Sequence, residues 1–283
     1  MPMFLLILAT IFWGASYLLT KIALQEISSL SFIFFRFLLA VVCLLPGLVY
    51  LRGKTHKRDI MRGAQLGVLL WGNMFLQTIG LETIAASLSA FLRGFAVVFV
   101  LVIHFVVQRA VPRFVDIVAS LACMAGLGLI TQSYGLSWEP GVYYSLGCSF
   151  IMALYIYALS TYAGHSHILL LTLSQMTMLM LLTGLLAVFL ENKIQVPIQS
   201  ATWLAILFCG IFCSALGFWM LGYAQQYLSA FTVSMIGTLE LVFATIFSHL
   251  FLGEVLSSSF YLGAMMVLGA IGLINWRLKE LEA

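Results

Sequence analysis

The sequence predicts an all-α membrane protein with ten transmembrane helices, arranged as two inverted five-helix repeats around a central cavity. Composition, a series of apolar segments and an internal repeat lead to this prediction. Of the 283 residues, 63% are hydrophobic and 8% are charged, whereas soluble domains have about 25% charged residues. A water-soluble fold of this size cannot bury so much apolar surface, so most of the chain must face lipid.

Ten apolar segments have the length of a membrane span, which is about 20 residues. They lie at residues 3–22, 30–51, 63–81, 85–107, 114–132, 141–162, 168–190, 201–221, 227–251 and 258–276. The first is too long for a signal peptide and lacks its basic start, so we expect it to be retained. Residues 52–62 form the one long polar connection, which leaves no room for a soluble domain.

Lysine and arginine residues are distributed unequally between the two sides of the predicted bundle. Nine of them fall on the side shared by both termini, against two, Lys21 and Lys193, on the other. Because cytoplasmic loops carry the excess of positive charge, we expect both termini in the cytoplasm. The net charge of +3 comes largely from these orienting residues, so no nucleic-acid partner is predicted.

The two halves of the chain match at a constant spacing of 144 residues. Residues 98–99 match 242–243, and residues 128–130 match 272–274. This predicts a first repeat at 1–135 and a second at 136–283. Since five is odd, the second repeat enters the membrane from the opposite face. Inverted repeats recur in secondary transporters, with the substrate site near the midplane; a structural membrane protein that merely duplicated is the alternative.

Arg36, Arg93 and Glu240 are the charged residues well inside predicted spans. A charge near the bilayer centre costs at least about 2.5–3.5 kcal/mol, so it needs a partner or water. From the helical rise, Glu240 lies roughly 13 Å above the cytoplasmic boundary and Arg93 roughly 12 Å below the outer one. In a core about 30 Å thick, their depths differ by about 5 Å. Arg36 lies shallower, about 9 Å from the outer edge.

Two interpretations of the Arg93 and Glu240 charges stay open. In the first, a fixed salt bridge joins the two halves and contacts no substrate. In the second, the two groups bind the opposite ends of a zwitterion, and Glu240 is the candidate proton-coupling residue. For Arg36, a structural or gating role near the outer rim and a contact with ligand remain alternatives.

Polar and aromatic side chains on other spans complete the predicted substrate site. Asn73 and Gln77 are spaced i, i+4 and share one helix face, and a water-filled cavity would explain amides at that depth. The remaining members are Trp13, Tyr17, Trp71, Tyr155, Gln175 and Trp219. Core packing or interfacial anchoring explains each single aromatic equally well. As a set they predict an amphipathic cavity for a small polar metabolite with an apolar part.

The chain also resembles the EamA-like branch of the drug/metabolite transporter superfamily. The likeness covers essentially the whole sequence and rests on "WGASYLLTK" (13–21), "FRFLLA" (35–40), "SAFLRGFAVVFV" (89–100), "QQYLSA" (225–230) and "LELVFATIFSHLFLGE" (239–254). It implies a metabolite carrier of the bacterial inner membrane, frequently an exporter. Spans five and ten are then peripheral and are the surface on which a homodimer is expected.

The sequence departs from this family in two spans. Many members have a proline where this chain has Leu241, and the matching position of the fourth span is Val97. Since proline kinks a helix, these two helices are expected to be straighter than is usual in the family.

Other function classes find little support. The chain has no HExxH, GxSxG or P-loop sequence, so neither an enzyme nor an ATP-driven pump is predicted. The five cysteines lie in apolar stretches without metal-ligand spacing, and no metal or cofactor is expected. A lipid or polyprenyl flippase shares the fold and remains an alternative. We expect an alternating-access exporter of amino acids or similar metabolites, driven by protons or working by facilitated exchange.

Overall fold

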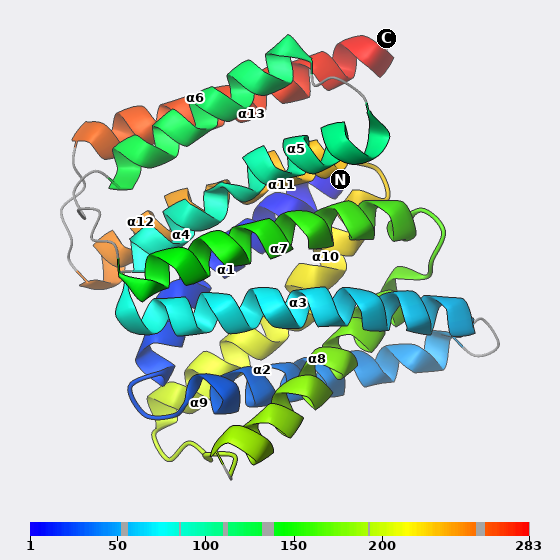
Figure 1. Cartoon of the computed structure of the whole chain (residues 1–283), viewed down its shortest axis with the longest axis vertical. Helices are drawn as coiled ribbons and strands as arrows, with labels where there is room; N and C mark the ends of the chain where they lie inside the picture. The colour runs from blue at the N-terminus through cyan, green and yellow to red at the C-terminus, as the bar shows by residue number, and fades with distance from the viewer. Residues whose placement is uncertain are drawn as a thin grey trace.

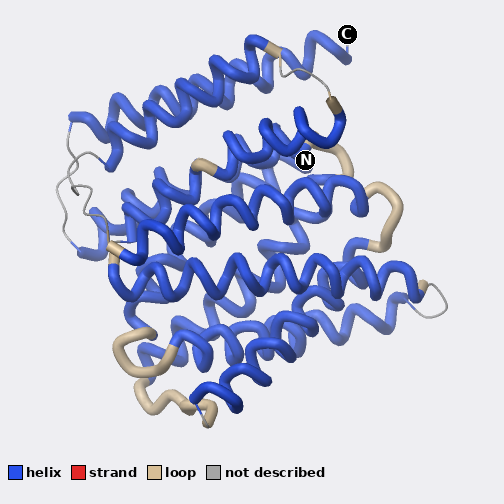
Figure 2. The backbone as a smooth tube through the Cα atoms, viewed as in Figure 1, coloured by secondary structure: helices blue, strands red, loops and turns tan. Residues whose placement is uncertain are grey.

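The computed structural model describes residues 1–51, 56–84, 86–109, 113–131, 139–191, 193–252 and 258–282. In these residues all regular structure is helical, and short loops join the helices (Figure 2). The helices are α1 (Pro2–Ala23), α2 (Ser29–Leu44) with the 3-10 helix η1 (Leu45–Leu51), α3 (Lys57–Thr83), α4 (Ala86–Gly94), α5 (Ala96–Gln108), α6 (Phe114–Thr131), α7 (Pro140–Ala163), α8 (Ile168–Glu191), α9 (Ser200–Phe208), the π-helix η3 (Cys209–Leu216), α10 (Gly217–Gln225), α11 (Ala230–Gly237), α12 (Leu239–Leu252) and α13 (Ser258–Glu282).

These helices form ten membrane-length rods in the described part of the chain, because several consecutive helices continue one another. Seven rods are long and apolar enough to cross a bilayer. The helices α6 and α13 contain shorter apolar stretches, at Phe114–Leu129 and Ser258–Ile274. The tenth rod, α3, is 27 residues long and more polar. The prediction of an all-α, ten-span membrane protein is confirmed.

Local sequence explains where several helices begin. Pro2 and Pro140 occupy the first turn of α1 and α7, where the missing N–H of proline needs no partner. The side chains of Ser28 and Ser229 cap α2 and α11 by accepting hydrogen bonds from the backbone N–H groups three residues ahead, at 3.2 and 3.1 Å. Such caps satisfy N–H donors that the first helical turn leaves free.

The contacts between helices have a twofold pattern. A contact between one of the first five rods and one of the last five recurs between the two corresponding rods. Helix α3 packs on α7 and α8, α1 packs on α10 and α12, and α2 packs on α8 and η3. The pair α6 and α13 lies side by side at the edge of the bundle, and both chain ends lie at one end of it (Figure 1). The predicted boundary at residue 135 lies outside the described residues, so the division into 1–135 and 136–283 stays a prediction.

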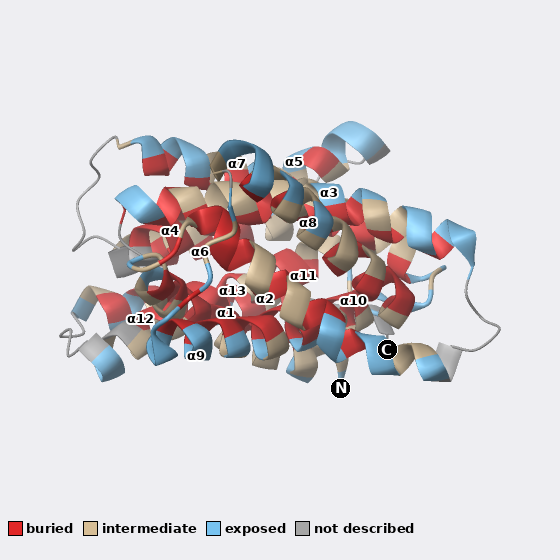
Figure 3. Cartoon of the chain, turned by 90° about the horizontal axis from the view of Figure 1, so that it is seen from below, coloured by how far each residue is buried: buried red, intermediate tan, exposed pale blue. Residues whose placement is uncertain are grey.

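Glycine allows close contact between several helices in the interior. A Cβ atom on Gly67 of α3 would lie 2.7 Å from the carbonyl oxygen of Gln175 on α8, and one on Gly63 would lie 2.8 Å from that of Leu171. Small residues at such points let membrane helices approach at backbone distance. Buried residues accordingly gather between the helices, while exposed ones cover the outside (Figure 3).

Two spans that the sequence predicts as single helices are interrupted. Phe95 separates α4 from α5, and Thr238 separates α11 from α12. With the 144-residue spacing, Phe95 corresponds to position 239, so the two breaks fall within one residue of the same repeat position. Whether these two spans are straighter than is usual in the family stays a prediction. Gly94 and Gly237 stand directly before the breaks, and glycine weakens a helix interior without any proline.

Acidic side chains fix the turn between α1 and α2, at the end of the bundle opposite the termini. Ser29 donates a hydrogen bond from its hydroxyl to Glu82, and Ser28 donates one to Glu191. A carboxylate oxygen of Glu26 accepts hydrogen bonds from the backbone N–H groups at positions 198 and 199. This end of the bundle is therefore closed by contacts between three loops.

Glu26→Gln is expected to remove an acid-dependent part of the stability. The Thr202 hydroxyl, and after it the backbone N–H groups of Ile198 and Gln199, hold the pKa of Glu26 below its ordinary value against desolvation, which raises it. A lowered folded-state pKa gives stability that is fully present above the unfolded-state pKa and is lost as pH falls through the folded-state one. Thermal unfolding of the purified protein at a series of acidic pH values measures this. Equal pH slopes for wild type and variant would contradict it.

Candidate functional site

Two opposite charges meet in the interior of the bundle. The Nε atom of Arg93 lies 3.4 Å from Oε2 of Glu240, and the two side chains are 10% and 9% exposed. Arg93 stands two residues before the break at Phe95, and Glu240 stands two residues after the break at Thr238. The interruptions of the two helices thus frame the ion pair, which joins the fourth and ninth rods.

Neutral acceptors surround the other end of the Arg93 guanidinium. Its Nη1 atom donates to the side-chain oxygens of Gln77 at 2.8 Å and Asn73 at 3.3 Å. The sulfur atoms of Cys148 and Met152 lie 3.6 Å from Nη1 and 3.7 Å from Nη2. Helices α3 and α7 therefore hold the guanidinium on the side opposite Glu240.

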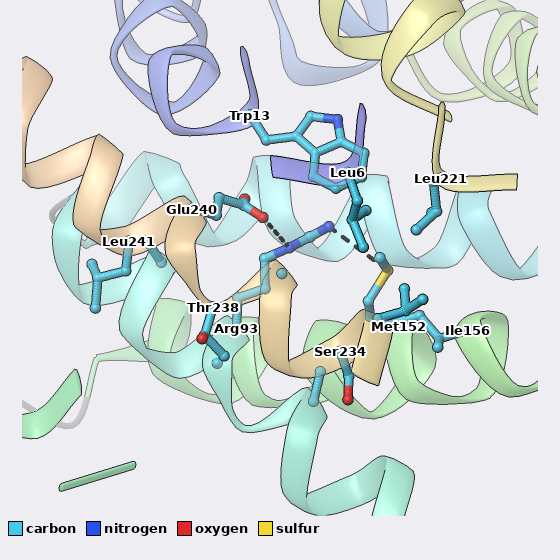
Figure 4. Close-up of a pocket in the computed structure, with 15 residues that line it drawn as sticks. Leu6, Trp13, Arg93, Met152, Ile156, Leu221, Ser234, Thr238, Glu240 and Leu241 are labelled. Atoms are coloured by element: carbon cyan, nitrogen blue, oxygen red, sulfur yellow. Dashed lines mark hydrogen bonds and ion pairs between the residues drawn. The ribbon is translucent and has the colours of Figure 1, made fainter. Parts of the chain in front are cut away.

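A small cavity lies against the ion pair (Figure 4). Its volume open to the centres of water molecules is about 40 Å³, whereas one buried water needs about 10–15 Å³ measured in this way. The space therefore suits a few water molecules and is too small for a metabolite. Its walls are mostly apolar and come from Leu6, Trp13, Ala90, Arg93, Gly94, Ala96, Met152, Ile156, Leu221, Val233, Ser234, Gly237, Thr238, Glu240 and Leu241.

The cavity extends from the ion pair towards the end of the bundle that carries the termini. Leu6 lies in the first turns of α1, Leu221 in the last turns of α10, and Val233 near the start of α11. On the other side, α1 and α12 pack closely: a Cβ on Gly14 would lie 2.9 Å from the backbone nitrogen of Ala244 and 3.0 Å from the carbonyl oxygen of Glu240. Helices α1 and α12 are therefore in backbone contact beside the ion pair.

Trp13 connects the cavity wall to the π-helix. Its indole Nε1 donates a hydrogen bond of 2.9 Å to the carbonyl oxygen of Cys213, inside η3. Its ring also packs at 5.5 Å from that of Phe218. A π-helix changes the backbone hydrogen-bond pattern, and such segments occur frequently at functional sites.

Trp13→Phe is expected to destabilise the protein by about 1–3 kcal/mol, because the carbonyl oxygen of Cys213 loses its buried donor while most of the ring packing stays. Trp219→Phe serves as control, since Trp219 only stacks on Tyr223, at 5.9 Å. Thermal unfolding of the two variants side by side measures the difference. Equal losses would show that the indole hydrogen bond contributes nothing.

Tyr17 stands one helical turn from Trp13 and is 1% exposed. Glu240 and Arg93 act on its hydroxyl electrostatically, yet the hydroxyl makes no hydrogen bond of ordinary geometry to the described residues. A buried hydroxyl without a partner costs roughly 1–3 kcal/mol. A buried hydroxyl that lies next to two charges and makes no hydrogen bond of ordinary geometry is unusual.

The other predicted aromatic and amide residues lie away from the cavity. Tyr155 donates to Gln175 at 3.1 Å, and both are fully buried. Trp71 stacks on Phe75 at 5.4 Å. These residues, with Trp219, do not line the cavity in this state, so their assignment to the substrate site stays a prediction.

Arg36 forms a separate polar site between α2 and η3. Its Nε donates to the hydroxyl of Ser214 at 2.8 Å, and its guanidinium lies 5.5 Å from the ring centre of Phe37. The side chain is buried, and Arg36 is not among the described residues that line the cavity beside the ion pair.

Several residues around the pair carry no signal in the sequence. Cys148 and Met152 lie one turn apart on α7, and Thr238, directly after α11, lies one turn from Ser234 within it. In an apolar span, sulfur-containing and small hydroxyl side chains are indistinguishable from packing residues, although the i, i+4 spacing could have shown that each pair shares a face. Within the described residues, no three His, Cys, Asp or Glu side chains gather as metal ligands.

Comparison with known proteins places the chain in a family. The model of the EamA-like transporter family matches residues 1–132 and again residues 139–276. A protein of Archaeoglobus fulgidus described as an uncharacterized transporter is 26% identical over 272 residues, which are 96% of this chain and 85% of its own. A crystal structure of a protein with 14% identity shares the fold, with a TM-score of 0.81 over 100% of this chain and 99% of its own. The chain therefore belongs to the EamA-like transporter family and is a multi-pass membrane protein.

Proposed function

We propose that the protein is a secondary transporter that exports small amphipathic metabolites, amino acids in particular, across the inner membrane by alternating access. The observation that carries this proposal is the buried ion pair of Arg93 and Glu240 at the wall of a cavity between the two halves. Intramembrane charges of this kind mark substrate or ion pathways. Transport, and not catalysis, is the activity that such a site supports.

A zwitterion fits both charges of the site. Its carboxylate would replace Glu240 at Nε of Arg93, and its ammonium group would donate a hydrogen bond to the carbonyl oxygen of the Glu240 side chain. The apolar part of the cargo would pack against Leu6, Leu221 and Val233, which line the inner part of the cavity. Because the present cavity holds only a few waters, the bundle must open before cargo enters.

The direction of export follows from the proposed orientation. Lys57, Arg58 and Arg62 begin α3 at the end of the bundle where both termini lie (Figure 1), and positive residues favour the cytoplasmic side. The cavity extends towards this same end, so cargo would load from the cytoplasm. The close contact of α1 with α12 would then be the outer closure that separates to release it.

A flippase would need a wide lateral opening for a lipid chain. The cavity beside the ion pair, about 40 Å³ in volume, is no such opening, so a small soluble cargo is the proposal that we prefer.

Flux measurements in proteoliposomes test the proposal. Labelled amino acids with aliphatic, aromatic and charged side chains are screened with wild type, with Arg93→Met and with protein-free vesicles. The expected result is transport of at least one neutral amino acid by wild type and background flux in the variant. Gly272→Val on α13, where an added Cβ atom meets no other atom within 4 Å, should retain at least half of the wild-type rate. Background flux of every amino acid with folded wild type would contradict the proposal.

A further inference from the structure

The hydroxyl of Tyr17 is a buried donor and acceptor beside an ionisable group. It makes no hydrogen bond of ordinary geometry in the described part of the chain, although it lies close enough to the Glu240 carboxyl group to interact with it as a weak hydrogen-bond partner. Glu240 and Arg93 act on it electrostatically, and Trp13, one turn away on α1, lines the cavity. The hydroxyl therefore lies beside Glu240 but is not yet bound to it by a hydrogen bond of ordinary geometry.

The ion pair itself is arranged so that Glu240 can leave it. The contact is single and 3.4 Å long, while Gln77 and Asn73 hold the other end of the guanidinium at 2.8 and 3.3 Å. The sulfur atoms of Cys148 and Met152 complete its surroundings. All four acceptors are neutral, so they hold Arg93 equally well whether Glu240 is charged or protonated.

We propose that Tyr17 is the second hydrogen-bond partner of Glu240 and holds its carboxyl group away from Arg93 after protonation. As a carboxylate, Glu240 accepts from Arg93. When a hydronium ion in the cavity gives it a proton and becomes water, the carboxyl group turns to Tyr17 and donates its O–H to the phenolic oxygen. The freed Nε–H of Arg93 is then open to the carboxylate of the cargo. This inference rests on the proposed function. It assigns the proton that drives transport to the Glu240 carboxyl group, bound to Tyr17.

The groups facing Glu240 leave Tyr17 as the suitable partner. The titratable or charged groups that interact with Glu240 from neighbouring elements are Tyr17 of α1, Arg93 of α4, Cys148 of α7 and Cys213 of η3. The thiol of Cys148 already accepts from Asn73 at 3.0 Å, and that of Cys213 donates to the carbonyl oxygen of Phe12 at 3.2 Å. A phenolic oxygen is also a stronger acceptor than a thiol sulfur.

Infrared difference spectroscopy of the protein in lipid, acid minus neutral pH, tests the inference without any cargo. The protonated carboxyl group of Glu240 gives a C=O stretching band, which is identified by its absence in Glu240→Gln. Tyr17→Phe keeps the ring but removes the oxygen, so this band should move to higher wavenumber as the carboxyl group loses its partner. A band at the wild-type position in Tyr17→Phe would overturn the proposal, as would the absence of any band that depends on Glu240.

Tyr155→Phe is the matched control, because Tyr155 is an equally buried tyrosine whose hydroxyl is bound to Gln175. Its carboxyl band should stay at the wild-type position, while its melting temperature falls because Gln175 loses a donor. Tyr17→Phe should melt no lower than wild type. A shifted band in both variants would contradict a specific role of Tyr17. The flux screen tests the transport proposal and the spectra test the role of Tyr17. Because the spectra need no cargo, the failure of one proposal can be distinguished from the failure of the other.

Discussion

Replacement of Arg93 by methionine is expected to destabilise the protein by about 3–5 kcal/mol, the usual cost of leaving a buried charge unpaired, and to reduce transport to background. Methionine occupies most of the volume of the arginine stem but donates no hydrogen bond. Glu240 would lose its cation, and Gln77 and Asn73 would lose the donor that they share. Denaturant or thermal unfolding in detergent, beside flux in proteoliposomes, measures the two effects.

The companion variants separate the structural from the functional role of the pair. Glu240→Gln should cost less stability than Arg93→Met, because Arg93 keeps its neutral acceptors and the new amide oxygen still accepts from Nε. In the double variant Arg93→Met/Glu240→Met no charge remains buried, so much of the lost stability should return, while transport should stay at background. Normal transport by the double variant would show that the pair is only a structural tie.

Gly14→Val is expected to give the second large effect, a loss of the outer closure. A Cβ atom at this position would lie 2.7 Å from the Cβ of Phe243 and 2.9 Å from the backbone nitrogen of Ala244. The obstacle is largely backbone, so α1 and α12 must separate, and the ion pair at Glu240 moves with them. Overpacking of a well-packed interior costs about 1–3 kcal/mol or more. We expect a lower melting temperature and transport below one tenth of wild type.

Gly272→Val on α13 is the control for this prediction. A Cβ atom there meets no other atom within 4 Å, so the substitution changes helix propensity in the same way but creates no clash. It should leave melting temperature and transport close to wild type. If Gly14→Val behaves like Gly272→Val, the close contact of α1 and α12 is not needed for the closed state.

The depth of the charges could be predicted from the sequence, because helical rise and bilayer thickness fix it. The estimate that Arg93 and Glu240 differ by about 5 Å in depth is compatible with the contact of 3.4 Å. The i, i+4 spacing of Asn73 and Gln77 likewise indicates the shared face that the structure shows, since both accept from one nitrogen of Arg93. Their role in cargo binding stays a prediction.

Rotation of the helices about their own axes could not be predicted. In a membrane helix, lipid and protein interior are both apolar, so the pattern of apolar residues does not say which face points inward. The sequence therefore does not distinguish Trp71 and Trp219 from Trp13, although of these three only Trp13 lines the cavity. For the same reason the sulfur contacts of Cys148 and Met152 with Arg93 are visible only in the structure.

The two helix breaks could not be predicted from the sequence either, because a break is expected at proline and neither position has one. Gly94 and Gly237 precede the two interruptions, but glycine is common within membrane helices and does not by itself predict a break. Arg93 lies two residues before one break and Glu240 two residues after the other, and the two side chains are in contact.

Uptake driven by a pH gradient, measured in proteoliposomes with wild type beside Glu240→Gln, tests the central claim most directly. The cargo is the labelled amino acid that wild type transports fastest. The account predicts that the gradient drives accumulation against concentration in wild type, while the variant folds but shows no response to the gradient. Equal gradient-driven accumulation by both proteins would contradict the claim that Glu240 is the charge on which transport depends.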